Sequence, residues 1–424
     1  MLALYLCYFT FGFAMTFGSI AMNFEMMDSL KFTPVEMTMS YGVIAIPWCI
    51  KPLFGIISDK YHVADWGKRR PYIFCSGILL AYMYVTLPNL IGTKTSMIAT
   101  MTMVSFFMCF ADVCADCITV DFAKKESVKG KTQSTCWSSR ALGSVIGSSL
   151  GGSFYEMYGY KPTFQLIALP CLIMGCCIWT LAKNETGAPN NMCKKLVKAV
   201  YKKRVLAFAI FGISIGPNYG PLYTYFLRKE LNYTPEDFQW ITIAGSYSFL
   251  ASTFIYKTCL LNVSPLKLMR VSIYCAVACS LVQLLVVTKL STSLVLIVFD
   301  TIGQSLFGMW IMMPLIVIVA HNAEEGLEGT FYALLMSVSN LSAVIADELG
   351  GLVANMFGVT RDNFDNMACV IVVGAVADLV IPLFIVNSKS FAAFFEEKPK
   401  RDPKRDQKDR NPDSEVQMGQ IHCP

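Results

Sequence analysis

The sequence predicts an all-α membrane protein in which twelve transmembrane helices form two pseudo-symmetric six-helix bundles. Composition is the first reason: the chain of 424 residues is 54% hydrophobic and 15% charged, with a mean hydropathy of +0.50. So few charges could not cover that apolar surface in water, which excludes a soluble protein. Segment length is the second reason, because twelve apolar runs reach the roughly 20 residues that a bilayer-crossing helix needs.

An internal repeat is the third reason. The second half of the chain echoes the first at an offset of about 200 residues. Leu30–Pro34 (LKFTP) reappears as Leu231–Pro235 (LNYTP), and the stretch 130–160 reappears with many matches at 329–359. Duplicated membrane halves of this size are typical of two-bundle secondary transporters, which hold their substrate between the bundles.

Each expected helix is an apolar run of sufficient length, separated from the next by polar, Pro-containing or Gly-containing residues. In the first half these runs cover 2–23, 35–58, 69–92, 95–123, 130–158 and 161–183. In the second half they cover 204–229, 234–259, 266–288, 293–321, 327–356 and 364–388. The longest runs predict helices that tilt or project beyond the hydrocarbon.

Lysine and arginine set the expected orientation and the domain limits. They concentrate in alternate loops, and the positive-inside rule then places both ends of the chain in the cytosol. We therefore expect an N-terminal bundle at 1–183, a cytosolic linker at 184–203 and a C-terminal bundle at 204–388. The remaining stretch, 389–424, is rich in charge and proline, which predicts a disordered cytosolic tail.

The same composition argues against several other functions. The 16 Cys lie mostly inside apolar segments without zinc-like or disulfide spacing, and the 3 His are scattered, so no metal site is expected. We recognise no nucleophile–base arrangement and no nucleotide-binding loop, so neither an enzyme nor a cofactor is expected. The net charge of +5 lies in loops between apolar runs and does not indicate nucleic-acid binding. The expected partners of this monomer are a lipid bilayer and a small-molecule substrate.

Four charged residues inside the expected helices are the main candidates for binding: Lys51, Asp112, Asp116 and Arg140. Such groups are costly in a bilayer and need a partner, water or a function. Asp112 and Asp116 share one face of a helix because they are four residues apart. Counting from the cytosolic helix ends puts Asp112 level with Arg140 at about 15 Å, and Asp116 level with Lys51 at about 10 Å. The set either handles substrate or protons, or only neutralises itself and fixes packing.

Two tryptophans extend this candidate site. Trp48 and Trp137 each lie three residues from a basic residue, Lys51 and Arg140 respectively, which is about one helical turn. Their flat rings can stack on a planar ligand. The predicted substrate-binding set therefore comprises Lys51, Asp112, Asp116, Arg140, Trp48 and Trp137.

A second group of charged residues is expected to control gating. Asp59 ends the second helix, and Arg69 and Arg70 open the third, so carboxylate–guanidinium pairing there could hold a cytosolic gate shut. Asp121 lies near the cytosolic end of its helix and suits a similar latch.

The second half contains intramembrane acids without basic partners in their own helices. These are Asp300, Asp347, Glu348 and Asp378. Asp347 occupies the repeat position of Ser148, so its acid departs from the symmetric plan and is a candidate for protonation. Coupling of transport to protons is a hypothesis that rests on these acids. A packing or hydrogen-bonding role is expected for Asp378.

Several strings in the first half form a recognisable set. They are Pro47–Gly55 (PWCIKPLFG) with Ser58 and Asp59, Arg69–Tyr72 (RRPY), Ala111–Asp116 (ADVCAD), and Ser139–Gly143 (SRALG) with Gly151 and Gly152. Together they resemble the folate-biopterin transporter family of the major facilitator superfamily. Their order and spacing hold across nearly the whole membrane region, most densely in the first half.

The resemblance implies a twelve-helix carrier of the major facilitator fold for folates, pteridines such as biopterin or, in some members, S-adenosylmethionine. Lys51, the two aspartates of the fourth helix and Arg140 match family positions linked to binding or transport. A pterin edge suits a carboxylate, and the glutamate tail of folate needs cations such as Arg140 and Lys51.

Three alternatives stay open at this level. A sugar–proton symporter also carries a run like Arg69–Pro71 after its second helix, and a non-transporting receptor or scaffold could use the same fold. The solute could also be S-adenosylmethionine, whose sulfonium would favour Asp and aromatic contacts. The plasma membrane is the default location, with an organellar membrane as the alternative.

Overall fold

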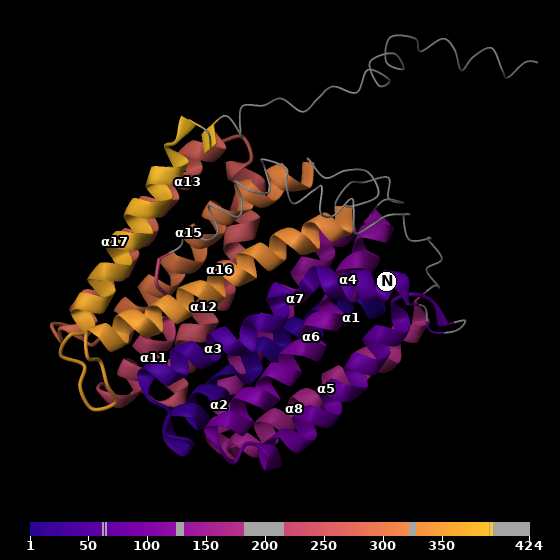
Figure 1. Cartoon of the computed structure of the whole chain (residues 1–424), viewed down its shortest axis with the longest axis horizontal. Helices are drawn as coiled ribbons and strands as arrows, with labels where there is room; N and C mark the ends of the chain where they lie inside the picture. The colour runs from indigo at the N-terminus through magenta and orange to yellow at the C-terminus, as the bar shows by residue number, and fades with distance from the viewer. Residues whose placement is uncertain are drawn as a thin grey trace, which may run out of the picture.

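The computed structural model describes residues 1–61, 63, 66–123, 131–181, 216–321, 328–389 and 391–392, and in these ranges every regular element is a helix. Figure 1 shows the indigo-to-magenta helices of the first half lying beside the orange-to-yellow helices of the second half. The predicted linker 184–203 and nearly all of the predicted tail 389–424 lie outside the described residues, so the domain limits stay a prediction.

The first half contains six helical spans. The first consists of α1 (Leu2–Phe17), α2 (Ser19–Phe24) and the π-turn η1 (Glu25–Ser29), and the second of α3 (Pro34–Cys49) and α4 (Lys51–Lys60). They are followed by α5 (Arg70–Leu90), α6 (Lys94–Ala123), α7 (Lys131–Tyr158) and α8 (Tyr160–Cys177), which ends in a short 3₁₀ turn, Ile178–Thr180.

The second half repeats this order. Its described helices are α11 (Gly220–Lys229), α12 (Pro235–Ile255) with the π-turn η4 (Tyr256–Leu260), α13 (Pro265–Ser280) with α14 (Val282–Val287), α15 (Leu294–His321), α16 (Glu328–Met356) and α17 (Met367–Val386). The described outer bounds agree with the expected segments to within a few residues, except that the first span continues to Ser29, beyond its expected end at 23.

Described residues that are not helical fall inside four of the expected segments, away from their ends: Gly18, Ile50, residues 216–219 and Leu281. The expected segment 35–58 divides at Ile50 into α3 and α4, because Pro47 and Pro52 flank that position and proline has no amide hydrogen to donate. In the expected segment 204–229, residues 216–219 are not helical and α11 begins only at Gly220. Pro217 and Pro221 explain this, since a residue before proline also avoids the helical region.

The internal repeat is also a structural repeat. Lys31 and Asn232 both have positive φ, 55° and 56°, in matching turns. The next helix in each half starts with a capping box, formed by Thr33 with Glu36 and by Thr234 with Asp237. These boxes satisfy backbone amides that the first turn of a helix would leave without partners. The repeated sequence therefore encodes repeated helix starts.

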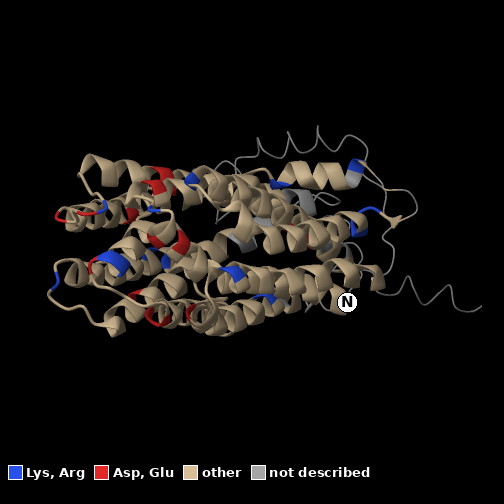
Figure 2. Cartoon of the chain, turned by 90° about the horizontal axis from the view of Figure 1, so that it is seen from below, with Lys and Arg blue, Asp and Glu red and all other residues tan. Residues whose placement is uncertain are grey.

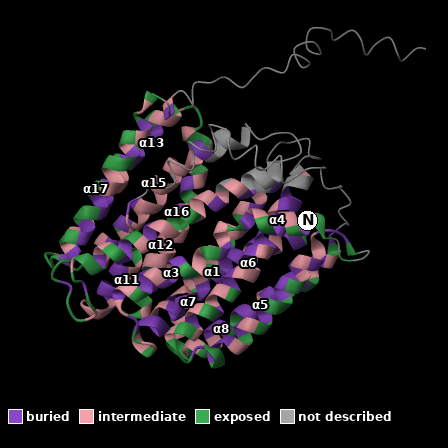
Figure 3. Cartoon of the chain, viewed as in Figure 1, coloured by how far each residue is buried: buried purple, intermediate pink, exposed green. Residues whose placement is uncertain are grey.

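Eight spans are long and apolar enough to cross a membrane, among the residues that the structure describes. The helices α7, α12 and α16 are equally long but richer in Gly, Ser and polar residues, and they make the contacts between the bundles, α7 with α12 and α16 with α3. Small residues let helices approach closely where apolar lipid is replaced by protein. Apolar side chains such as Phe384 and Val295 are 78% and 73% exposed, as a lipid-facing surface requires. Figure 3 shows exposed residues along outer helices such as α5 and α17.

Glycine brings the first span against α7. A Cβ atom at Gly143, Gly147 or Gly151 would overlap the backbone of α1. These glycines are four residues apart and therefore lie on one face of α7. The close contact fixes Arg140, which lies one turn before Gly143, beside the first span and over the centre of the molecule.

Candidate functional site

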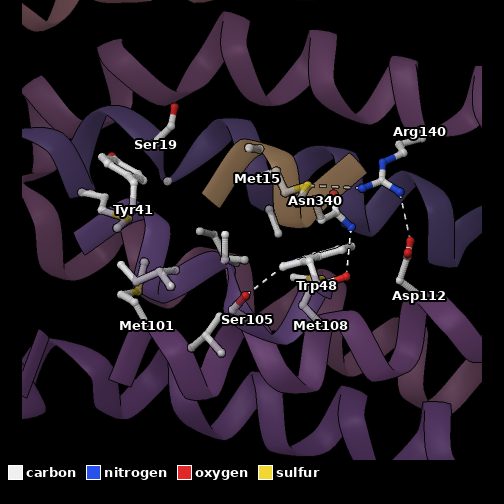
Figure 4. A pocket seen from close by; sticks show the side chains of 18 of the residues that line it. Met15, Ser19, Tyr41, Trp48, Met101, Ser105, Met108, Asp112, Arg140 and Asn340 are labelled. Carbon is white, nitrogen blue, oxygen red and sulfur yellow. Dashed lines mark hydrogen bonds and ion pairs between the residues drawn. The ribbon is translucent and has the colours of Figure 1, made fainter. Parts of the chain in front are cut away.

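A cavity of about 600 Å³ lies between the two bundles (Figure 4). Most of its wall comes from α1, α3, α6 and α7 of the first half. The second half closes it with Phe249 from α12 and with Met336 and Asn340 from α16. All six residues predicted to bind substrate, Trp48, Lys51, Asp112, Asp116, Trp137 and Arg140, line this one cavity.

Asp112 is the centre of the charged wall. Lys51 Nζ lies 2.6 Å from its Oδ2, and Arg140 Nη1 donates to its Oδ1 at 2.9 Å. The Asp112 side chain is 1% exposed and that of Lys51 is 5% exposed. Two cations from different helices thus share one buried carboxylate, and each depends on it for neutralisation.

Asp116 has a different environment. Tyr8 donates its hydroxyl hydrogen to Asp116 Oδ1 at 2.6 Å, while Lys51 Nζ is 3.9 Å from Oδ2. The similar depths of Asp116 and Lys51 predicted that these two side chains would be closest partners. That prediction was wrong, because Lys51 lies nearer to Asp112. Helical side chains lean toward the N-terminus of their helix, and the longer lysine side chain reaches one turn further than an aspartate does. Lys51, which begins α4 after the break at Ile50, consequently meets Asp112.

The two tryptophans lie against the two cations. The Trp48 ring centroid is 4.8 Å from Lys51 Nζ, and the Trp137 ring centroid is 5.6 Å from Arg140 Cζ. Trp48 is held in place by donating from Nε1 to Ser105 Oγ at 2.9 Å. Each cation–π contact is favourable in a partly desolvated site. The arrangement offers aromatic faces directly beside charged groups.

One donor of the site points at a weak acceptor. Arg140 Nη2 lies 3.3 Å from the thioether sulfur of Met15 (Figure 4). A thioether is a weak acceptor, so an oxygen or nitrogen of a ligand would form a stronger hydrogen bond there. The Arg140 side chain is 17% exposed, which leaves it accessible from the cavity.

Several residues of the site were not predicted from the sequence. Tyr8 binds Asp116, Ser105 binds Trp48, and Asn340 of α16 donates to the Trp48 backbone oxygen at 3.0 Å. Asn340 matters because it connects the second bundle to the wall of the cavity. In the sequence, Asn340 is recognisable only as an amide side chain in the middle of an apolar run. That pattern does not show on which face of the helix the side chain lies.

Arg69 and Arg70 are the predicted cytosolic gating residues whose side chains the structure describes. Arg70 Nη1 donates to the backbone oxygen of Leu181 at 2.7 Å, and its guanidinium lies 5.7 Å from the Trp179 ring. Arg69 also makes interactions within the described structure. The side chains of Asp59 and Asp121 lie outside the described part of the chain, so the predicted latch stays a prediction.

Asp347 lies apart from the charged wall. Its carboxylate accepts a hydrogen bond from Asn218 Nδ2 at 2.6 Å, and it lines a smaller cavity together with Asn23 and Tyr41. Asn218 belongs to the non-helical residues 216–219, so its hydrogen bond to Asp347 joins this segment to α16. The protonation of Asp347 stays a prediction.

The bundles are tied together at the end that the positive-inside rule places outside. Asp28 of η1 accepts from Arg228 Nη2 at 2.8 Å and also pairs with Lys229. Nearby, the Phe24 and Phe238 rings meet edge to face at 5.6 Å. Figure 2 shows the described acidic residues gathered toward the end opposite the N-terminus. This ion-paired contact, the Asp28 latch, closes that end of the structure.

Comparison with known proteins agrees with this architecture. The model of the BT1 family matches residues 11–391. The folate-biopterin transporter of Synechocystis sp. is 26% identical over 395 residues, covering 90% of this chain and 80% of the relative. Folate transporter 1 of Plasmodium falciparum is 22% identical over 383 residues, covering 87% and 75%.

Solved structures show the same fold. The nucleoside transporter NupG superposes with a TM-score of 0.69 at 15% identity, over 94% of this chain and 99% of that chain. A D-xylose-proton symporter superposes with a TM-score of 0.68 at 13% identity, over 91% and 96%. The predicted major facilitator fold and the predicted family resemblance are both confirmed.

Proposed function

The chain belongs to the BT1 family, and from this premise we propose that it is a secondary active transporter of folate- or pteridine-type solutes. The relatives reported above are named as folate or folate-biopterin transporters, which supports a carrier rather than an enzyme. The observation that carries the proposal is the shared carboxylate of Asp112, held by Lys51 and Arg140 in the wall of a cavity between the bundles.

The cavity matches the chemistry of such a solute. A pterin ring is flat, so it can stack on Trp48 or Trp137, and its amino and ring N–H edge donates to a carboxylate such as Asp116. An anionic tail would be attracted to Arg140, whose second nitrogen now contacts only a thioether. A volume of about 600 Å³ lies within the usual range of small-molecule sites.

Alternating access supplies the mechanism in this proposal. The structure is closed at the Asp28 latch, so opening toward that side requires the ion pairs of Asp28 with Arg228 and Lys229 to break. Solute binding would favour one state by bridging Asn340 of the second bundle and the charged wall of the first. Proton coupling through Asp116 is part of the proposal, because its hydrogen-bond partner is a neutral tyrosine rather than a close cation.

Uptake of labelled folate, biopterin, S-adenosylmethionine and sucrose into proteoliposomes tests this function. We expect saturable uptake of a folate or biopterin, lost in Asp112→Asn and Arg140→Ala, and retained in Lys94→Gln. Lys94 is a suitable control because its pair with Glu36 is exposed and lies outside the cavity. Uptake of sucrose or S-adenosylmethionine alone would show that the substrate belongs to a class other than folates and pteridines. No uptake by folded protein would contradict transport of all these solutes.

A proton gradient imposed on the same proteoliposomes tests the coupling. We expect an acidic exterior to drive accumulation of the solute above equilibrium, and this drive to disappear in Asp116→Asn. Equal rates with and without the gradient would contradict proton coupling while leaving the substrate assignment in place.

A further inference from the structure

A second cavity, of about 450 Å³, lies inside the C-terminal bundle and shares none of its described lining residues with the cavity at Asp112. The described part of its wall is formed by residues 216–220, α13, α14, α15 and α17. Apolar side chains such as Ile273, Ile311 and Pro382 make one part of the wall, and polar residues make another. None of the described lining residues is a lysine or an arginine.

Gln283 borders this cavity and is held in one orientation. Its side-chain amide donates from Nε2 to Asp300 Oδ2 at 2.6 Å, which fixes the orientation of the amide group. The residue is only 9% exposed, and its Oε1 is enclosed without a hydrogen-bond partner in the described structure. Gln283 therefore contributes a fixed polar part of the wall.

Two carboxylates near the cavity are met only by neutral donors among the described residues. Asp378, near the middle of α17, lines the cavity and accepts from the Gly216 amide at 2.8 Å. Asp300 lies behind Gln283 and accepts from the amides of Gln283 and Gln304. Negative charge at membrane depth without a nearby base attracts a cation.

Non-helical backbone supplies another part of the described wall. Residues 216–219 are not helical, and this backbone forms one side of the cavity. Non-helical backbone at membrane depth is tolerated where it is buried in protein or lines a cavity. The Gly216 amide is already used by Asp378, which places the carboxylate against this segment.

We propose that this cavity is a second binding site, specific for a small organic ammonium ion. The N–H groups of the ligand donate to the carboxylate of Asp378, and its apolar part packs against Ile311 and Pro382. A bare inorganic ion is too small to fill the volume, and an anion would face the carboxylate of Asp378. The site is separate from the cavity at Asp112 and does not depend on the function proposed above.

Calorimetric titration with n-butylammonium chloride tests the proposal, using the full-length protein in lipid nanodiscs and potassium chloride as the ionic control. We expect saturable binding of the ammonium ion and a raised Tm, with no comparable effect of potassium. Asp378→Asn keeps the shape and the Gly216 hydrogen bond but removes the charge, so it should weaken binding at least about tenfold. Asp112→Asn, in the other cavity, should leave this binding unchanged.

A second variant blocks the cavity while keeping every polar group. Gly308 lines the cavity and has open space around the position of a Cβ atom, so Gly308→Leu fills the volume without a clash at that atom. We expect Gly308→Leu to fold and to abolish binding of n-butylammonium. The proposal is overturned by no saturable binding to the wild type, by equal stabilisation with potassium, or by unchanged binding in both Asp378→Asn and Gly308→Leu. Loss in Asp112→Asn alone would also overturn it, by placing the ligand in the first cavity.

Discussion

The two halves of the molecule share a frame but differ in how they neutralise charge. The turns at Lys31 and Asn232 have the same backbone shape, and the helices that follow them start with the same capping box. Inside the bundles, however, Asp112 of the first half pairs with Lys51 and Arg140. The acids of the second half accept hydrogen bonds from amide groups instead.

This difference shows which features of the duplicated chain were kept. Caps and turns determine whether each helix starts in the right place, so both halves require them. Charges at the centre do not determine the fold, and they can be paired in one half and left to neutral donors in the other. We infer that the first half provides the cations for the transported solute and the second half provides acceptors.

The largest effect is expected at the paired charges. Asp112→Ala removes the carboxylate that Lys51 and Arg140 share and leaves Lys51 with the more distant Asp116 at 3.9 Å, which should lower the free energy of unfolding by about 3–5 kcal/mol and abolish uptake. The double variant Asp112→Leu with Lys51→Met should recover part of the stability without recovering uptake. Thermal unfolding in detergent measures the first effect. Equal stability of Asp112→Ala and the wild type would show that these charges are already hydrated.

A smaller loss of stability is expected at the glycines that the repeat places in equivalent positions. A Cβ atom at Gly151 would overlap the backbone of Phe17, and one at Gly350 would overlap the backbone of Asn218. Alanine at either position should therefore destabilise by about 1–3 kcal/mol through overpacking. Gly308→Ala is the matched control, because open space surrounds that position and alanine favours helix. A stabilising effect of alanine at Gly151 or Gly350 would contradict the close approach of the helices.

The Asp28 latch should contribute to the balance between conformations. Asp28→Asn removes the partner of Arg228 and Lys229, whose side chains are partly exposed, so we expect about a tenfold shift toward the state open on that side. Labelling of a cysteine introduced at Ser19, which lines the central cavity, measures the shift from the outside. An unchanged labelling rate would mean that the Phe24–Phe238 contact alone holds that end closed.

The smallest effect is expected at the two capping boxes. Thr33→Ala and Thr234→Ala each remove a side-chain acceptor from the first turn of a helix and should each cost about 1 kcal/mol. Because the geometry is the same in both halves, the two losses should agree closely. If thermal unfolding shows a loss of stability for only one of the two variants, the two halves share the geometry of the capping box but not its contribution to stability.

The sequence predicted the helices well because burial of apolar length dominates in a bilayer. It also predicted that Lys51, Asp112, Asp116 and Arg140 gather, since unpaired charges at that depth are costly. It did not predict which acid Lys51 meets, because that depends on the break at Ile50 and on the reach of the side chain.

The non-helical residues 216–219 and the cavity beside them were also not predicted from the sequence. The signal was present in Pro217 and Pro221, but their apolar surroundings favoured a continuous helix. Uncharged partners such as Tyr8 and Asn340 were missed for a different reason. The sequence around a polar residue in an apolar run does not indicate which helix that residue will contact.

Equilibrium binding of labelled biopterin and folate to the purified protein in lipid nanodiscs is the most direct test of the central claim, that the cavity at Asp112 and Arg140 holds the solute. The account predicts saturable binding that Arg140→Ala and Asp112→Asn each weaken at least about tenfold, while Lys94→Gln and Asp378→Asn leave it unchanged. Binding that survives in both Arg140→Ala and Asp112→Asn, with each variant shown to be folded, would contradict it.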